Sequence, residues 1–123
     1  MGLDVAVRFP AGVPAWDAIK SHLARVGEAA PLRMIDGMPA FPDETPEPGW
    51  RELRVGAGGG MVTIRHTADS FACIVWGNAD AALLAARDRV VWACAAAGGG
   101  TVVTDAGVVS PTEFAQLSSI RPE

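Results

Sequence analysis

The chain contains few of the side chains that most often carry out catalysis or hold metal ions. Its 123 residues include two histidines and two cysteines, and their positions lack the short spacings of a zinc site. There is no G-x-S-x-G motif, and a predicted strand, not a helix, follows the glycine run at 56–60. The sequence therefore predicts no catalytic residue, no metal site and no cofactor.

Basic charge is scarce as well. Ten Lys and Arg face fourteen Asp and Glu, which gives a net charge of −4. Because nucleic-acid-binding surfaces usually carry a basic surplus, this balance argues against a nucleic-acid partner. No apolar run approaches the roughly 20 residues that a membrane span needs. Asp4 and Arg8 interrupt the first ten residues, which do not resemble a secretory signal. We therefore expect a cytoplasmic protein without a membrane partner.

Apolar residues, in contrast, are plentiful. They make up 50% of the chain, which is enough for a folded core, and the length predicts one domain over 1–123. Cys73 and Cys94 lie in apolar runs, so we expect two buried free thiols in a reducing compartment. Lys20 is the one lysine among ten basic residues, and alanine and glycine are abundant. This bias is typical of GC-rich bacterial genomes.

Hydrophobic spacing predicts alternating strands and helices. The expected strands are 3–9, 32–35, 50–55, 61–66 and 71–77, and the expected helices are 14–26 and 79–97, the second with Asn78 as its N-cap. A proline-rich acidic loop is expected over 36–49. The C-terminal tail, 101–123, should form a hairpin and a short helix, because Ser110 and Glu113 have the spacing of a capping box.

This order of elements predicts an α+β fold, a two-layer sandwich with two helices on one face of an antiparallel sheet. It resembles the half-repeat of the TATA-binding-protein-like fold. The alternative is a ferredoxin-like βαββαβ arrangement that uses 101–104 as its last strand. In the expected register Leu53 opposes Ile64, Ile64 opposes Cys73, and Glu52 opposes Arg65.

The tryptophans give the strongest functional signal. The expected register places Trp50 and Trp76 on the outer face of the sheet, and Trp92 lies off the apolar stripe of its helix. Either the loop 36–49 or the segment 110–120 covers these rings, or they form an interaction patch with Arg54 and Arg65. Trp and Arg are enriched at interface hot spots, so such a patch would bind a protein partner or a second copy of the chain.

An alternative interpretation is a small-ligand-binding protein or a modest enzyme. Its polar residues would be His66, Asp80 and Arg87, placed in the groove between helices and sheet. We weigh this against a non-enzymatic bacterial interaction or regulatory module, which the missing nucleophile–base pairs favour.

The stretch ALLAARDRVVWACAAAGGGTVVTDAGVVSPTEF, residues 82–114, is similar to the ends of small bacterial α+β proteins. Some of these are grouped with immunity proteins of toxin systems. The similar features are the helix, the triple glycine 98–100, the turn around Asp105, and the segment from Ser110 to Phe114. The resemblance implies a toxin-binding role without catalysis.

Overall fold

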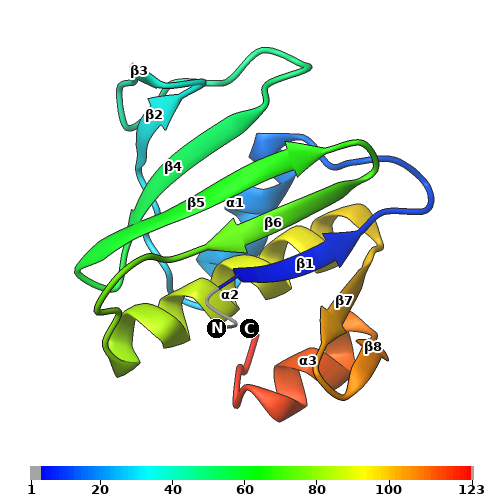
Figure 1. Ribbon diagram of the computed structural model, residues 1–123. Helices are drawn as coiled ribbons and strands as arrows, with labels where there is room; N and C mark the ends of the chain where they lie inside the picture. Colours follow the sequence, from blue (N-terminus) through cyan, green and yellow to red (C-terminus); the bar gives the residue numbers. More distant parts are fainter. Residues whose placement is uncertain (1–3, 123) are drawn as a thin grey trace.

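The computed structural model describes residues 4–122, which form one antiparallel sheet and three helices (Figure 1). The helices are α1 (Trp16–Arg25), α2 (Ala81–Gly98) and α3 (Pro111–Leu117). The strands are β1 (Asp4–Arg8), β2 (Leu32–Ile35), β3 (Met38–Pro39), β4 (Glu52–Ala57), β5 (Gly60–Thr67), β6 (Ser70–Ile74), β7 (Thr101–Thr104) and β8 (Gly107–Val109). The predicted α+β sandwich is confirmed.

The eight strands follow the order β3-β2-β4-β5-β6-β1-β7-β8. The first strand of the chain therefore lies between β6 and β7, and both pairings are antiparallel. All described strand pairs are antiparallel, so the parallel pair of a split βαβ unit is not present among residues 4–122. The tail extends the sheet through β7 and β8, and the ferredoxin-like alternative is wrong.

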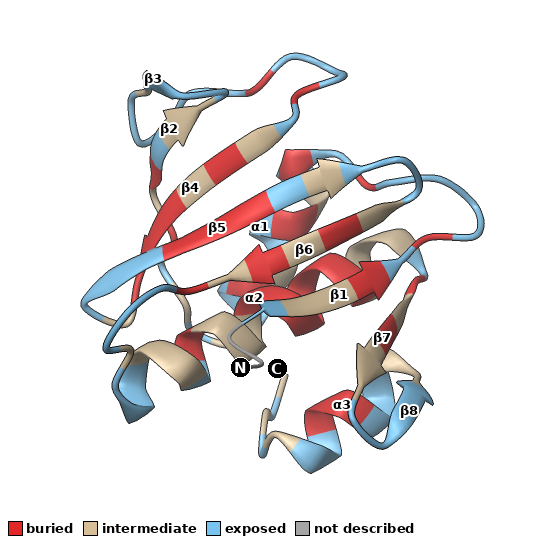
Figure 2. Cartoon of the chain, viewed as in Figure 1, coloured by how far each residue is buried: buried red, intermediate tan, exposed pale blue. Residues whose placement is uncertain are grey.

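The predicted register of the central strands is confirmed. Leu53 pairs with Ile64, Ile64 pairs with Cys73, and Glu52 pairs with Arg65. Because side chains alternate along a strand, this register places one apolar face of the sheet against the helices. Buried residues accordingly concentrate in the central strands and in α2 (Figure 2).

The middle of α2 is buried on all sides, because α2 packs against the sheet, α1 and α3. Six consecutive residues, 90–95, are buried in this helix. Trp92 is among them, with its ring 5.8 Å from the ring of His22 on α1. The expectation that Trp92 lies outside the core is corrected here, since a second helix covers the side of α2 that a two-layer view leaves in solvent.

The ends of α2 depend on specific polar and small residues. Asp80, not Asn78, is the N-cap, and its carboxylate accepts a 2.9 Å hydrogen bond from the backbone N–H of Leu83. At the other end Gly99 adopts a left-handed conformation, with φ of 60°. The following residue, Gly100, lies directly against β1, where an added Cβ would be 2.4 Å from the carbonyl oxygen of Arg8.

The loop 36–49 is more structured than expected, and the tail forms the hairpin and short helix that the sequence predicts. The loop 36–49 includes the two-residue edge strand β3, and Pro46 within it is buried. In the tail, Ser110 accepts a hydrogen bond from the Glu113 backbone, and Glu113 accepts one from the Ser110 backbone. The predicted capping box is therefore confirmed. Within residues 4–122, no helix combines the length and apolar character needed to cross a membrane.

Candidate functional site

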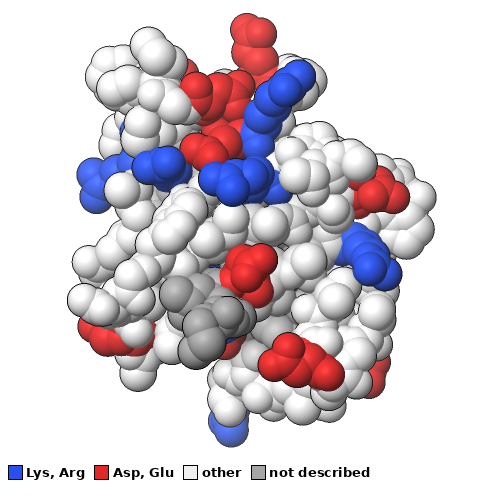
Figure 3. Space-filling model, viewed as in Figure 1, with Lys and Arg blue, Asp and Glu red and all other residues white. Residues whose placement is uncertain are grey.

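Within residues 4–122, one face of the sheet carries no helix. In Figure 1 α1 and α2 lie behind the strands, and the viewer looks onto the opposite surface, which we call the open face. The residues that point toward it alternate with the core residues along each strand. One row across the sheet consists of Arg54, Thr63, Ile74 and Asp4, which the register aligns. Figure 3 shows that much of this face is uncharged, with a band of basic side chains near β4.

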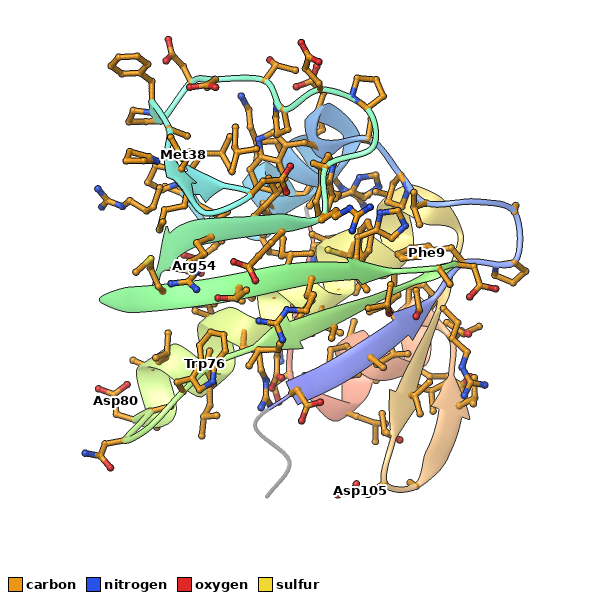
Figure 4. All side chains as sticks on the ribbon, turned by 45° about the horizontal axis from the view of Figure 1, so that its top comes forward. Phe9, Met38, Arg54, Trp76, Asp80 and Asp105 are labelled. Carbon is orange, nitrogen blue, oxygen red and sulfur yellow. The ribbon has the colours of Figure 1, made fainter. Side chains whose placement is uncertain are left out.

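A charged cluster lies on the open face around Glu52. Its carboxylate accepts from Arg54 at 3.3 Å through one oxygen and from Arg65 at 3.1 Å through the other. The Arg54 guanidinium also lies 5.8 Å from the ring centre of Trp76, within cation–π range. Figure 4 shows Arg54 and Trp76 on the same side of the sheet. These contacts hold the cluster in one geometry more than they stabilise the fold, because the two guanidinium groups are partly solvated.

Apolar side chains surround this cluster. Trp76 is 54% exposed, Met61 43% and Val108 55%, although all three are large and hydrophobic. Smaller apolar residues between them are half-buried and join these positions into one surface; they are Ala6, Ala72, Ile74 and Val103. A surface that combines an exposed indole, ordered arginines and aliphatic groups has the composition of a protein-binding interface.

The structure brings together three of the five residues predicted for an interaction patch, namely Arg54, Arg65 and Trp76. It places Trp50 elsewhere, because the ladder of β4 begins at Glu52 and Gly49 turns the chain with φ of 90°. The strand alternation therefore does not extend back to Trp50. Its ring lies in the core, 5.1 Å from the ring of Phe71. Trp92 is buried between the two long helices, as described above.

The three residues of the alternative groove do not converge. His66 lies at the end of β5, with its ring 5.9 Å from that of Trp50. Asp80 caps α2 at the opposite end of the molecule from Phe9, as Figure 4 shows. Arg87 lies midway along α2 and forms a 2.9 Å ion pair with Asp88. None of the cavities described below contains two of these three residues.

The two cysteines meet between the layers, which their positions in the sequence did not reveal. Cys73 on β6 and Cys94 on α2 are both free and fully buried, so the prediction of buried free thiols is confirmed. A hydrogen bond to Cys73, together with burial, raises the pKa of the Cys94 thiol well above its ordinary value. The Cys94 thiol is therefore protonated and unreactive at neutral pH.

This raised pKa predicts a loss of stability in alkali. Above about pH 8.5 the unfolded thiol ionises while the native Cys94 keeps its proton, so the unfolded state binds fewer protons. The free energy of unfolding should then fall by about 1 kcal/mol per pH unit. Urea titrations between pH 8 and pH 10 measure this slope, in a chain that contains no tyrosine and one lysine. The variant Cys94→Ala is the control and should show a smaller slope; an equal slope would contradict the assignment.

Sequence reasoning missed a cavity of about 170 Å³ on the helix side of the sheet. Three parts of the chain line it: residues 13–16, Pro46 together with residues 48–50, and His66. No short motif joins these parts, so only the tertiary structure reveals them.

Within the described part of the chain, no group of three or more His, Cys, Asp and Glu side chains could hold a metal ion.

Over the described residues, the fold defines an α+β protein in which helices cover one surface of the sheet and leave the other uncovered. Comparison with protein-family models, with curated proteins and with solved structures finds no match to this chain.

Proposed function

We propose that this chain is a non-enzymatic protein-interaction module and that its open face binds a second copy of the chain. The observation that carries the proposal is the exposed Trp76, ordered by Arg54 within an apolar surface that residues 4–122 leave uncovered. An indole held in place loses little conformational freedom on binding, which favours its use as an anchor.

The charges of the open face support a second copy as the partner. A two-fold symmetric interface places the same patch on both sides, so a patch of one sign repels itself. Here Glu52 lies between Arg54 and Arg65, and carboxylate and guanidinium groups are neighbours. Two such clusters can face each other with opposite charges in contact. The aliphatic residues of β1, β6 and β7 would then pack as two sheets do in a sandwich, about 10 Å apart.

The placement of the potentially reactive side chains supports a binding role over a catalytic one. The Nδ1 atom of His22 lies 2.9 Å from the carbonyl oxygen of Ala18 in the same helix. Both ring nitrogens of His66 face backbone carbonyl oxygens, those of Trp50 and Ala68. The two imidazoles therefore contact the backbone of their own fold, and the two thiols are buried in its core.

A measurement of molar mass in solution tests the proposal. We expect sedimentation equilibrium to give twice the chain mass at micromolar concentrations. The variant Trp76→Arg should weaken association at least tenfold, since it removes a central apolar anchor and adds like charge across the two-fold axis. The variant should keep its fold, because the Trp76 side chain is half exposed in the monomer, and its melting temperature should fall only by the stabilisation that association supplies.

Leu117→Arg is the matched control. Leu117, at 67%, is also an exposed apolar residue, and it belongs to α3, which packs against α2. This variant should leave the mass of the assembly unchanged. A wild-type chain that stays monomeric at high micromolar concentration would refute the proposal that the open face binds a second copy of the chain. Association with an unlike protein, which the resemblance to immunity proteins implies, would then be the next hypothesis to test.

A further inference from the structure

Two opposite charges stand at the ends of one row of residues on the open face. The row runs from Arg54 on β4 through Thr63 on β5 and Ile74 on β6 to Asp4 on β1. Three strand spacings, about 14 Å, separate its two charged ends. The structure accordingly contains no ion pair between Arg54 and Asp4 of the same chain.

Both charged ends of the row keep hydrogen-bonding capacity for a partner. Arg54 donates to Glu52 through Nε at 3.3 Å, and its other two guanidinium nitrogens make no hydrogen bond within residues 4–122. The Asp4 side chain is exposed and accepts no hydrogen bond from a described residue. A row with a cation at one end and an anion at the other is complementary to the same row laid over it in the reverse order.

The order of the strands defines the two-fold axis that brings two such rows together. Among the eight strands, β5 and β6 are the central pair, with β4 and β1 on either side of them. A two-fold axis parallel to the strands, between β5 and β6, lays β4 of each copy over β1 of the other. Arg54 of each copy then lies over Asp4 of the partner copy. An axis that runs along the row instead places Arg54 over Arg54 and Asp4 over Asp4, which is repulsive.

The same axis also matches two exposed apolar side chains. Met61 precedes Thr63 by two residues on β5, and Trp76 follows Ile74 by two residues just past the end of β6, so both lie toward the same end of this antiparallel pair. When β5 of one copy covers β6 of the other, each Trp76 lies over the partner copy's Met61. A thioether makes favourable contacts with an aromatic ring. A direct stack of the two Glu52 clusters would leave Asp4 without a cation, so it satisfies fewer groups.

From this geometry we infer that the two copies are related by a two-fold axis between β5 and β6, and that Arg54 and Asp4 pair across it and determine its specificity. The inference rests on the proposed function, since it names the contacts of the same dimer. It adds two equivalent ion pairs, each between residues that cannot reach one another within one chain.

Charge reversal tests the pairing. Asp4→Arg and Arg54→Asp, each studied alone by sedimentation equilibrium, place like charges together at both symmetric positions. Each variant should therefore associate at least about tenfold more weakly than the wild type. In a mixed dimer of the two variants, both positions again hold one guanidinium and one carboxylate. An equimolar mixture should therefore associate at least about fivefold more tightly than either variant alone.

Asp17→Arg is the matched control, because it makes the same change of charge at an exposed residue of α1, which lies behind the sheet in Figure 1. This variant should associate as the wild type does. A monomeric wild type would refute the dimer and the axis together. A dimeric wild type whose association Asp4→Arg does not weaken, or a mixture no tighter than its components, would overturn the axis and leave the dimer standing. If Arg54→Asp does not fold, equal association of Asp4→Arg and Asp17→Arg would overturn the axis by itself.

Discussion

Replacement of Phe71 by alanine should cost about 3–5 kcal/mol of unfolding free energy, a large share of the 5–15 kcal/mol that holds a typical domain together. Phe71 on β6 is fully buried and contacts three rings at once. Its centroid lies 4.7 Å from Phe9, 5.1 Å from Trp50 and 5.4 Å from His66. The alanine variant loses apolar burial and leaves a cavity that these large neighbours can fill only in part.

Denaturant unfolding monitored by tryptophan fluorescence measures this effect. The matched control is Phe41→Ala, because Phe41 is 75% exposed and lies in the loop 36–49. That variant should change stability by less than about 0.5 kcal/mol. If Phe71→Ala costs no more than the control, Phe71 is not the centre of the aromatic cluster.

The second large effect is expected at the junction of α2 and β1. Alanine at Gly100 should destabilise the fold by about 3 kcal/mol, because its methyl group has no room. An added Cβ would lie 2.4 Å from the carbonyl oxygen of Arg8 and 2.8 Å from the ring of Phe9. The first of these neighbours is backbone of a central strand, so it cannot move without breaking the pairing of β1.

The neighbouring Gly99 separates crowding from backbone conformation. An added Cβ at Gly99 would meet no atom within 4 Å, but the residue has φ of 60°. Gly99→Ala should therefore lower the free energy of unfolding by only about 1 kcal/mol, the cost of placing alanine in the left-handed conformation. Thermal unfolding of both variants measures whether Gly100→Ala is the more destabilising of the two. Equal losses would contradict the crowding argument, because Gly100 does not have the positive φ of Gly99.

The strand register, the helix caps and the turns could be predicted from the sequence. Alternation along 61–66 and 71–77, with short turns between them, fixed which residues face each other, and the Glu52–Arg65 pair follows from that register. The capping box at Ser110 and the glycine stop after α2 are equally local. Each of these signals depends on residues a few positions apart, so no knowledge of distant contacts was needed.

Other features depended on contacts between distant parts of the chain. The position of Trp92 could not be predicted, because a helical wheel shows one apolar stripe and not the second helix that covers the other side. Trp50 was misplaced because the strand alternation was extended back beyond Glu52, where the ladder of β4 begins. The Cys73–Cys94 pair and the cavity between residues 13–16 and His66 join segments that are far apart in the chain, and no spacing rule connects such residues.

The sequence by itself determined an α+β protein with a correctly paired central sheet and an outward face that carries Arg54, Arg65 and Trp76. Periodicity suffices for this, because hydrophobic burial forces each strand to turn one face inward. Only the tertiary structure decided which aromatic rings are covered. Packing of α1 on α2, and of the segment 46–50 over the sheet end, buried two of the surplus indoles and left Trp76 in solvent. Which tryptophans are buried depends on how helices, strands and loops pack together, and the pattern along a single element does not predict that packing.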